Sequence, residues 1–286
     1  MAGGGALALR DLLGAGQLVR APGAADALAA RLVERAGFPA VYMTGFGATA
    51  ARIGAPDIGL LTQTEMAGHA RAMVRATALP VIADADTGYG GAANLLRTVE
   101  ELAQAGVAAI HLEDQALPKR CGQMAGARLI PTQEHVRRLR GALAARGGSG
   151  LVVIGRTDAL GVEGLEPALD RARAYADAGV DLVFVDGVKT RAQVEAIARR
   201  LDAPKVLSLV DGTEAARIPA PEVAEMGFAV LLHALTTLLA ATRAMADALH
   251  TLAQDGTADP ATLTGYGEFT EIVGLGRYQD FERDHG

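Results

Sequence analysis

The sequence predicts an α/β protein that folds as a (β/α)8 barrel of the TIM type. Short runs of Val, Ile, Leu and Ala recur eight times along the 286 residues with little polar alternation, which is typical of parallel strands covered on both faces. Segments with helical period lie between the runs. No Pro- or Ser-rich linker divides the chain, and closing the strands into a barrel leaves no exposed edge strand. We therefore expect residues 1–286 to form one domain.

The predicted strands, in order, are residues 17–21, 40–44, 79–83, 108–112, 151–155, 181–185, 205–209 and 228–232. Helices are expected between them over residues 24–36, 63–76, 93–105, 132–145, 164–178, 191–201 and 219–226. Several of these helices end in Ala-Gly directly before a strand, at Gly37, Gly106 and Gly179, where glycine readily adopts the left-handed conformation of a helix end.

A long helix is expected after the last strand, over residues 234–254. It carries a broad apolar stripe made of Leu235, Leu238, Leu239, Met245 and Leu249. A single covering helix does not need so wide a stripe. We therefore expect this C-terminal helical extension, about residues 234–286, to contact other subunits of a homo-oligomer.

The composition of the chain limits which classes of binding partner and which cellular compartment are expected. The chain has 27 Lys and Arg against 33 Asp and Glu, and this net charge of -6 argues against nucleic acid as a partner. The longest apolar stretch, residues 228–241, is interrupted by polar residues and is shorter than the ~20 residues that cross a bilayer. The N-terminus lacks the basic segment of a signal peptide, so we expect a flexible start that leads into a short helix. A single cysteine, Cys121, cannot form an internal disulfide, which favours the cytoplasm.

Acidic residues gather after two predicted strands. Chemistry in such a barrel takes place on the loops at the carboxyl ends of the strands. Asp84 and Asp86 follow the third strand, and Glu113 follows the fourth. Three carboxylates in one mouth would raise one another's pKa values unless a cation lay among them, and oxygen ligands favour Mg²⁺ or Mn²⁺. The simpler alternative is that Asp84 and Asp86 cap the next helix or pair with Arg97.

The long connection between residues 114 and 131 holds the only cysteine. Connections longer than about 12–15 residues often serve as lids that close over a substrate. Cys121 follows Lys119 and Arg120 and precedes Gly122. We therefore expect an accessible thiol with a lowered pKa that can exchange a proton. The alternative is an inert, buried thiol.

Two further patterns are less specific. Residues 45–50, Gly-Phe-Gly-Ala-Thr-Ala, follow a strand and open a helix, as in dinucleotide-binding proteins, and Glu65 lies about twenty residues further on. The alternative is a tight turn of small residues, which the repeated β/α units and the acidic mouth favour. Among the histidines, His111 and His233 lie at strand ends and are the candidates for a site.

Four stretches together resemble the isocitrate lyase/phosphoenolpyruvate mutase superfamily, and within it the methylisocitrate lyase and 2,3-dimethylmalate lyase branch. They are residues 41–45 (VYMTG), 83–91 (ADADTGYGG), 118–122 (PKRCG) and 155–159 (GRTDA). The resemblance runs from about residue 17 to about residue 275. It implies a barrel enzyme that uses Mg²⁺ to break a carbon–carbon bond in a hydroxylated di- or tricarboxylate. The products would be an α-keto acid and a second carboxylic acid, formed through an enolate-like fragment.

The resemblance also implies how the metal and the substrate are held. Asp86 would hold the metal directly, and Asp84 and Glu113 would hold it through water. Thr44 and Gly45 would bind a carboxylate or keto oxygen of the substrate.

The same resemblance assigns the catalytic groups. Arg156 would pair with a substrate carboxylate, and Cys121, with Lys119 beside it, would protonate the departing carbanion. The subunits would form a tetramer, a dimer of dimers, with exchanged C-terminal helices. Further contacts to the substrate or the site are expected from Tyr42, Phe46, Asp57, Gly122, Gln123, Asp186 and His233.

Three departures from the family pattern bear on the substrate. Gln123 stands where the family's lid commonly carries His, and Asp186 stands where the lyase branch usually has Glu. The Asn and Thr expected after the seventh strand are replaced by Leu209 and Asp211. Because these positions face the distal part of the substrate in the family, the sequence leaves the identity of the carboxylate open.

Other functions also stay open at this point. A mutase or hydrolase acting on a carbon–phosphorus bond shares the fold, although the mutase lid carries Asn where this chain has Cys121. An oxaloacetate-type hydrolase or decarboxylase would use the same metal. A nicotinamide oxidoreductase would rest on residues 45–47 alone, and a non-catalytic oligomeric scaffold would make the acidic mouth incidental.

Overall fold

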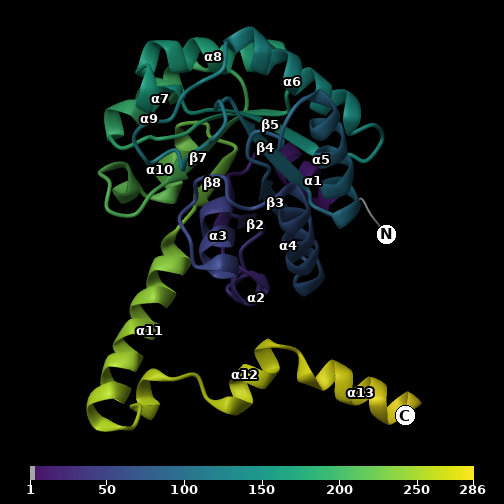
Figure 1. Ribbon diagram of the computed structural model, residues 1–286, viewed down its shortest axis with the longest axis vertical. Coiled ribbons are helices and arrows are strands. Elements are labelled where there is room, and N and C mark those ends of the chain that lie inside the picture. Colours follow the sequence, from purple (N-terminus) through teal and green to yellow (C-terminus); the bar gives the residue numbers. More distant parts are fainter. Residues whose placement is uncertain (1–3) are drawn as a thin grey trace. The chain divides into compact units, whose positions relative to one another are not determined.

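The computed structural model describes residues 4–286, and the flexible start expected before them lies outside this range. The chain divides into two units, Met1–Thr236 and Thr237–Gly286. The first unit is a closed barrel of eight parallel strands with helices around it (Figure 1), which confirms the predicted fold class.

All the predicted strands are present. They are β1 (Val19–Ala24), β2 (Val41–Met43), β3 (Val81–Asp84), β4 (Ala109–Glu113), β5 (Val152–Thr157), β6 (Leu182–Val185), β7 (Lys205–Leu209) and β8 (Val230–His233). Each strand pairs in parallel with its neighbours in sequence, and β1 closes the barrel against β8, with Val19 opposite Val230. The carboxyl ends of all the strands therefore meet at one mouth.

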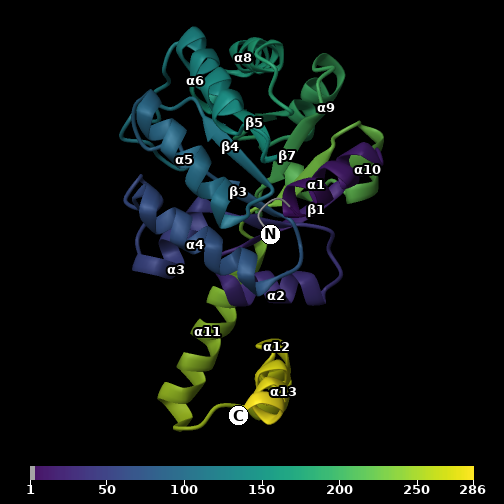
Figure 2. The same ribbon diagram turned by 90° about the vertical axis from the view of Figure 1, so that its right-hand side faces the viewer.

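The helices follow the predicted order. Two of them, α4 (Gln63–Ala76) and α6 (Thr132–Ala145), have the predicted bounds. Figure 2 shows α4, α5 and α6 side by side along one flank of the barrel. The sequence does not predict two short elements, α7 (Ala159–Val162) and the 3-10 turn η1 (Ala215–Arg217), because four and three residues are too few to show helical period. The other helices of this unit are α1 (Gly4–Gly14), α2 (Ala27–Arg35), α3 (Gly45–Ile53), α5 (Ala92–Ala105), α8 (Leu165–Asp177), α9 (Arg191–Arg200) and α10 (Ala220–Glu225).

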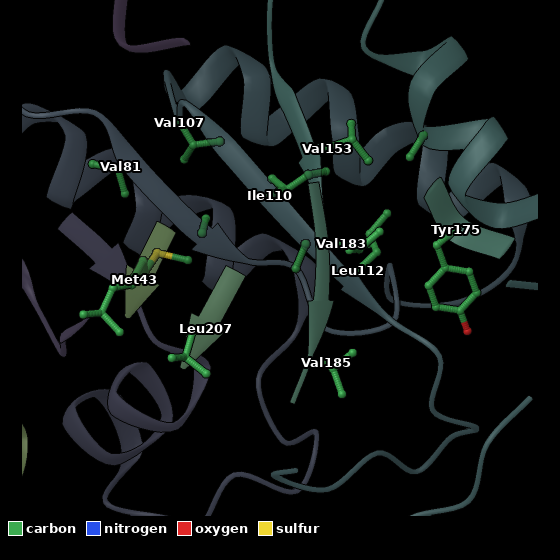
Figure 3. Packing of buried hydrophobic residues seen from close by; sticks show 14 of the residues in the cluster. Met43, Val81, Val107, Ile110, Leu112, Val153, Tyr175, Val183, Val185 and Leu207 are labelled. Atoms are coloured by element: carbon green, nitrogen blue, oxygen red, sulfur yellow. The ribbon is translucent and has the colours of Figure 1, made fainter. Parts of the chain in front are cut away.

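Alternate residues of each strand face opposite sides of the sheet, and this produces two apolar layers. The inner layer fills the barrel and includes Tyr42, Ile82, Ile154, Phe184 and Val206. The outer layer packs between the strands and the helices (Figure 3) and includes Val81, Ile110, Val153, Val183 and Leu207. The same alternation decides which residues at the strand ends face the mouth.

The amino-terminal end of the barrel is covered by α1. Its Leu9 belongs to the inner apolar layer and is 1% exposed. Arg10 of the same helix donates hydrogen bonds to the carbonyl oxygens of Gly150 and Leu151 and to the Asp181 carboxylate, all of which directly precede β5 or β6. This end is filled by apolar packing, and the polar strand ends lie at the opposite end.

The second unit contains α11 (Thr236–Asp255), the 3-10 turn η2 (Pro260–Thr262), α12 (Tyr266–Ile272) and α13 (Leu275–His285). The long helix predicted after the last strand is confirmed. None of these elements contains a buried residue, and Met245 and Leu249 of the predicted stripe are 58% and 64% exposed. Exchange of this extension between subunits stays a prediction. No helix among residues 4–286 is both long and apolar enough to cross a membrane.

Leu9→Ala tests the role of α1 in closing the barrel. Removing this buried side chain should lower the free energy of unfolding by about 2–5 kcal/mol, because a cavity remains at the base of the barrel. Leu7→Ala on the same helix, where Leu7 is 61% exposed, is the matched control. It should change the free energy of unfolding by less than about 0.5 kcal/mol. Urea unfolding followed by circular dichroism measures both, and equal effects would contradict the packing of α1 against the barrel.

Candidate active site

A cavity opens at the carboxyl ends of the strands. Predicted site residues that line it are Tyr42, Thr44, Phe46, Asp57, Asp84, Cys121, Gln123, Arg156 and Asp186. Others lie directly behind this lining, each in close contact with a lining residue: Gly45, Asp86, Glu113, Lys119 and Gly122. The structure therefore gathers most of the predicted residues at one place.

Asp84 and Asp86 are held in a tight turn at the end of β3. The Asp86 backbone N–H donates to Asp84 Oδ1 at 2.9 Å. Asp86 has a φ of 47°, a left-handed conformation that aspartate tolerates better than most residues. A Cβ at Gly45 would lie only 2.5 Å from Asp84 Oδ2. The glycine at the start of residues 45–50 therefore lets α3 approach this turn, as the small-residue alternative expects.

Glu113 is fully buried, yet neither oxygen of its carboxylate accepts a hydrogen bond. Arg156 Nη2 lies 3.5 Å from Glu113 Oε2. Burial raises the pKa of Glu113 well above its usual value, although Arg156 and Lys119 oppose this. Because a buried carboxylate without hydrogen bonds is costly, a cation with bound water fits this position.

The neighbouring aspartates have pKa values shifted in opposite directions. Burial raises the pKa of Asp86 to about 6, with Lys119 opposing the shift and Asp84 and Asp57 adding to it. For Asp84, the effect of burial is outweighed by His111, Lys119 and Arg156, and the pKa is lowered to about 2. Such divergence is typical of catalytic sites, and a divalent cation would favour the charged form of Asp86.

No three His, Cys, Asp or Glu side chains among the described residues are close enough to ligate one ion together. The arrangement that the resemblance implies needs only one direct ligand from the protein, since only Asp86 would contact the metal directly. Mg²⁺ usually takes one or two carboxylates and keeps several waters. The donor set around Asp86 and Glu113 is therefore compatible with Mg²⁺, and the individual ligand roles stay predictions.

Lys119 connects the lid to the acidic turn. Its Nζ lies 2.7 Å from Asp57 Oδ1 and 2.6 Å from Asp86 Oδ1, although this Asp86 oxygen accepts no well-aligned hydrogen bond. Burial alone would lower the pKa of Lys119, but Asp86, Glu113 and other acids raise it well above its usual value. Lys119 therefore stays charged.

Arg156 connects the ends of β5 and β6. Its Nη2 lies 2.8 Å from Asp158 Oδ1 and 2.7 Å from Asp186 Oδ2. The guanidinium carbon lies 5.4 Å from the centre of the Phe184 ring. Burial opposes the charge of Arg156, but Asp158 and Asp186 outweigh it and raise the pKa. A fixed arginine that lines a cavity is well suited to bind a carboxylate.

The lid is anchored at its base by Gln115, a residue that sequence reasoning missed. Gln115 Nε2 donates to the Arg120 carbonyl at 2.7 Å and to Asp158 Oδ2 at 2.8 Å, and its Oε1 accepts from the Arg120 N–H. Further along, the Cys121 N–H donates to the Asp57 carbonyl at 2.9 Å. These bonds hold the lid against the mouth.

Gly122 shows how closely the lid approaches the charged cluster. A Cβ at this position would lie 2.2 Å from Asp186 Oδ2 and 2.8 Å from Arg156 Nη2. A side chain at this position would force the buried Arg156 and Asp186 side chains to shift, so glycine favours the close approach of the lid. Gln123, the next residue, lines the cavity.

The Cys121 thiol differs from the prediction. Burial raises its pKa to about 11, so the lowered pKa expected from its basic neighbours is wrong. Lys119 extends to Asp57 and Asp86 instead, and its charge does not offset burial of the thiol. A thiol with a raised pKa keeps its proton at neutral pH, which suits a proton donor better than a nucleophile.

His111 lies behind the cavity and supports Tyr42. Tyr42 Oη and His111 Nε2 are 2.9 Å apart, and His111 Nδ1 is 3.7 Å from Asp84 Oδ1. Burial lowers the pKa of His111 to about 4, so the ring is neutral at pH 7. The histidine therefore helps to orient Tyr42, which lines the cavity.

The alternation of side chains along β7 shows that Leu209 and Asp211 do not face the cavity, contrary to the prediction. Leu209 packs in the outer apolar layer, and Asp211 accepts a hydrogen bond from Thr236 Oγ1 without lining the cavity. Ser208 and Val210 line it instead. The residues at the end of β7 that can contact the substrate are therefore Ser208 and Val210, each one position before a residue that the sequence suggested.

His233 is also outside the lining of the cavity, whereas the following residues, Ala234 and Leu235, contribute to it. Phe184 lines the cavity as well and was not predicted. Counting every second residue along β6 and β8 from an inward-facing position would have found Phe184 and Ala234. No comparable pattern marks Gln115.

The sequence from residue 9 to residue 253 matches the family described as phosphoenolpyruvate phosphomutase, over all eight strands of the barrel. The chain belongs to the phosphoenolpyruvate mutase/isocitrate lyase superfamily. The resemblance carried by the four stretches at the strand ends and in the lid is thereby confirmed. Enzymes of this superfamily generally use a divalent metal.

Superfamily relatives include lyases and a hydrolase. A 2,3-dimethylmalate lyase of Eubacterium barkeri is 37% identical over 279 residues, which cover 97% of this chain and 96% of the relative. A probable 2-methylisocitrate lyase of Corynebacterium glutamicum is 41% identical over 249 residues, 87% of this chain and 81% of the relative. The solved structure of an oxaloacetate acetylhydrolase with 3,3-difluorooxalacetate has a TM-score of 0.93 at 35% identity and covers 98% of this chain and 97% of its own.

The raised pKa of Cys121 can be tested by alkylation, because the chain contains no other cysteine. The rate with iodoacetamide should rise about tenfold per pH unit up to about pH 10 without a plateau, since only the thiolate reacts. The urea-denatured chain is the control, and its rate should level off near the ordinary thiol pKa of about 8.5. A plateau near pH 8 for the folded protein would show that burial does not hold the proton on Cys121.

Proposed function

We propose that this superfamily member is a Mg²⁺-dependent carbon–carbon lyase. It would cleave a hydroxylated carboxylate of the 2,3-dimethylmalate or 2-methylisocitrate type into an α-keto acid and a second carboxylic acid. The observation that carries the proposal is the buried Glu113, which accepts no hydrogen bond and stands at the same mouth as Asp86, Arg156 and Cys121.

The charge that develops during cleavage matches this site. Breaking the bond beside the hydroxyl-bearing carbon leaves an electron pair on the departing fragment, which becomes enolate-like and negatively charged. Mg²⁺ bound by Asp86, with Asp84 and Glu113 acting through water, would supply positive charge for the oxygens of the α-keto acid. The closed lid keeps bulk water from competing for these groups.

The substrate is oriented by the start of α3 and by Arg156. Thr44 caps this helix by accepting a hydrogen bond from the Gly47 N–H at 3.3 Å. The first N–H groups of a helix, here those of Gly45 and Phe46, have no partner within the helix and favour an anionic oxygen. Arg156 would hold a substrate carboxylate from the opposite wall.

Cys121 would deliver the proton that completes the reaction. As the carbon–carbon bond breaks, the substrate hydroxyl would give its proton to a carboxylate of the mouth and become the keto group, and the thiol would give its own proton to the carbanion. One proton leaves and one arrives, so no oxidant and no water are consumed. The raised pKa keeps Cys121 protonated until the basic carbanion forms.

A second candidate is hydrolysis of oxaloacetate, supported by the high similarity to the acetylhydrolase structure. That reaction would need a water molecule as nucleophile and would release oxalate and acetate rather than pyruvate. A carbon–phosphorus mutase is less favoured, because Cys121 stands in the lid where the resemblance expects Asn for that chemistry.

We also propose that the protein is a cytoplasmic homotetramer that exchanges its C-terminal extension between subunits. Support comes from the second unit, where no residue of α11, α12 or α13 is buried. Large apolar side chains such as Phe281, at 65% exposure, favour coverage by another copy.

Asp86→Ala tests the role of the metal. The variant should lose at least about a hundredfold in Mg²⁺-dependent pyruvate release from 2,3-dimethylmalate or 2-methylisocitrate, because the direct ligand is gone. Calorimetry should show weaker Mg²⁺ binding. Asp211→Ala, which removes an acid at a strand end outside the cavity, is the control and should retain activity. Mg²⁺-dependent turnover that survives in Asp86→Ala would contradict the ligand assignment, and no pyruvate from either substrate with the unaltered protein would contradict the proposed function.

Cys121→Ser tests the proton donor. Serine holds its proton too tightly to replace the thiol, so turnover should fall by about 10²–10⁴. Mg²⁺ affinity, measured by calorimetry, should stay unchanged because Cys121 is not a ligand. Turnover close to that of the unaltered protein would remove Cys121 from the mechanism while leaving the metal site in place.

A further inference from the structure

The cavity has two chemically different walls. One wall carries the charged groups Asp57, Asp84, Arg156 and Asp186. The other wall comes from the ends of β7 and β8, which are neighbours in the barrel, and consists of Val210, Ala234 and Leu235, with Ser208 at its edge. A bound molecule must therefore present ionic groups to one side and small apolar groups to the other.

The number of cations at the cavity limits how many carboxylates it can bind. Arg156 is the only basic residue among those that line the cavity. Its Nη2 already contacts Asp158 and Asp186, at 2.8 and 2.7 Å, and lies 3.5 Å from Glu113. Lys119, the nearest other cation of the site, is held between Asp57 and Asp86.

Gln123 adds no charge on the side of the lid. It lines the cavity as a neutral amide, which can donate a hydrogen bond but cannot neutralise an anion. A substrate carboxylate at the metal and a second one at Arg156 would each have a cationic partner. A third carboxylate beside Val210 or Leu235 would be removed from water without one, which is strongly unfavourable.

We infer that the cavity selects a dicarboxylate whose remaining substituents are small alkyl groups, and that Val210 is a residue that determines this specificity. The inference rests on the proposed lyase function and narrows its substrate class. A methyl group that lay against Val210, Ala234 and Leu235 would be removed from water at no electrostatic cost.

The two candidate substrates form a matched pair for this test. In 2,3-dimethylmalate and in 2-methylisocitrate the same bond is broken, with the electron pair left on the carbon that the thiol protonates. Both release pyruvate, and the second product is propionate from the first and succinate from the second. The substrates differ only in that a methyl group of the dicarboxylate carries an additional carboxylate in the tricarboxylate.

The Mg²⁺-loaded protein should cleave 2,3-dimethylmalate with a kcat/KM at least about a hundredfold higher than that for 2-methylisocitrate, because the extra carboxylate lacks a partner. Val210→Thr replaces a methyl group with a hydroxyl group at little change of shape and should reduce this ratio at least about fivefold by making the wall polar. Asp211→Asn, next in sequence but outside the cavity, is the control and should leave the ratio unchanged. A kcat/KM ratio near one, or a preference for the tricarboxylate, would overturn the inference. Pyruvate release in that experiment would still support the proposed lyase function.

Binding to Cys121→Ser gives a second measurement that does not depend on turnover. Calorimetry with Mg²⁺ present should show at least about tenfold tighter binding of 2,3-dimethylmalate than of 2-methylisocitrate. Tighter binding of the tricarboxylate would overturn the inference. If the unaltered protein released no pyruvate from either compound, the proposed function would fail, and the binding ratio would still decide the specificity of the cavity.

Discussion

Negative charge buried at the mouth of the barrel is the constraint on which the rest of the site depends. Strand alternation turns carboxylates inward from β3, β4 and β6, where they leave bulk water. Two cations each hold two acids from different segments: Lys119 binds Asp57 and Asp86, and Arg156 binds Asp158 and Asp186. Glu113 is the acid whose oxygens accept no hydrogen bond, and a divalent ion would complete the charge balance.

The lid belongs to the same electrostatic unit. Lys119 links the lid to the acidic turn through its ion pair with Asp86. Gly122 lets the backbone of the lid lie close to the side chains of Arg156 and Asp186. The burial that this closure produces also raises the pKa of Cys121. Exclusion of water and retention of the proton on the thiol are thus two results of one packing arrangement, and both favour protonation of a carbanion over attack by a nucleophile.

Periodicity is sufficient to predict the barrel, because the strands are mostly apolar runs and the helices around the barrel have an apolar face. The acidic turn and Arg156 are also predictable from the sequence, because they lie at the carboxyl ends of apolar strands. The prediction for Cys121 failed because it considered sequence neighbours, whereas the pKa depends on burial by distant segments. The prediction for Leu209 is wrong because the alternation along β7 turns Ser208 toward the cavity and Leu209 toward the outer layer. Gln115 lies in the lid connection, where no period marks a buried side chain.

We propose that one divalent ion sits among the carboxylates of the barrel mouth. Anomalous diffraction from crystals soaked with Mn²⁺, which accepts the same oxygen ligands as Mg²⁺, locates such an ion directly. We expect a single strong peak in each mouth, in direct contact with Asp86 and joined to Asp84 and Glu113 through water. A mouth without a peak, or an ion bound at residues elsewhere in the chain, would contradict the proposal.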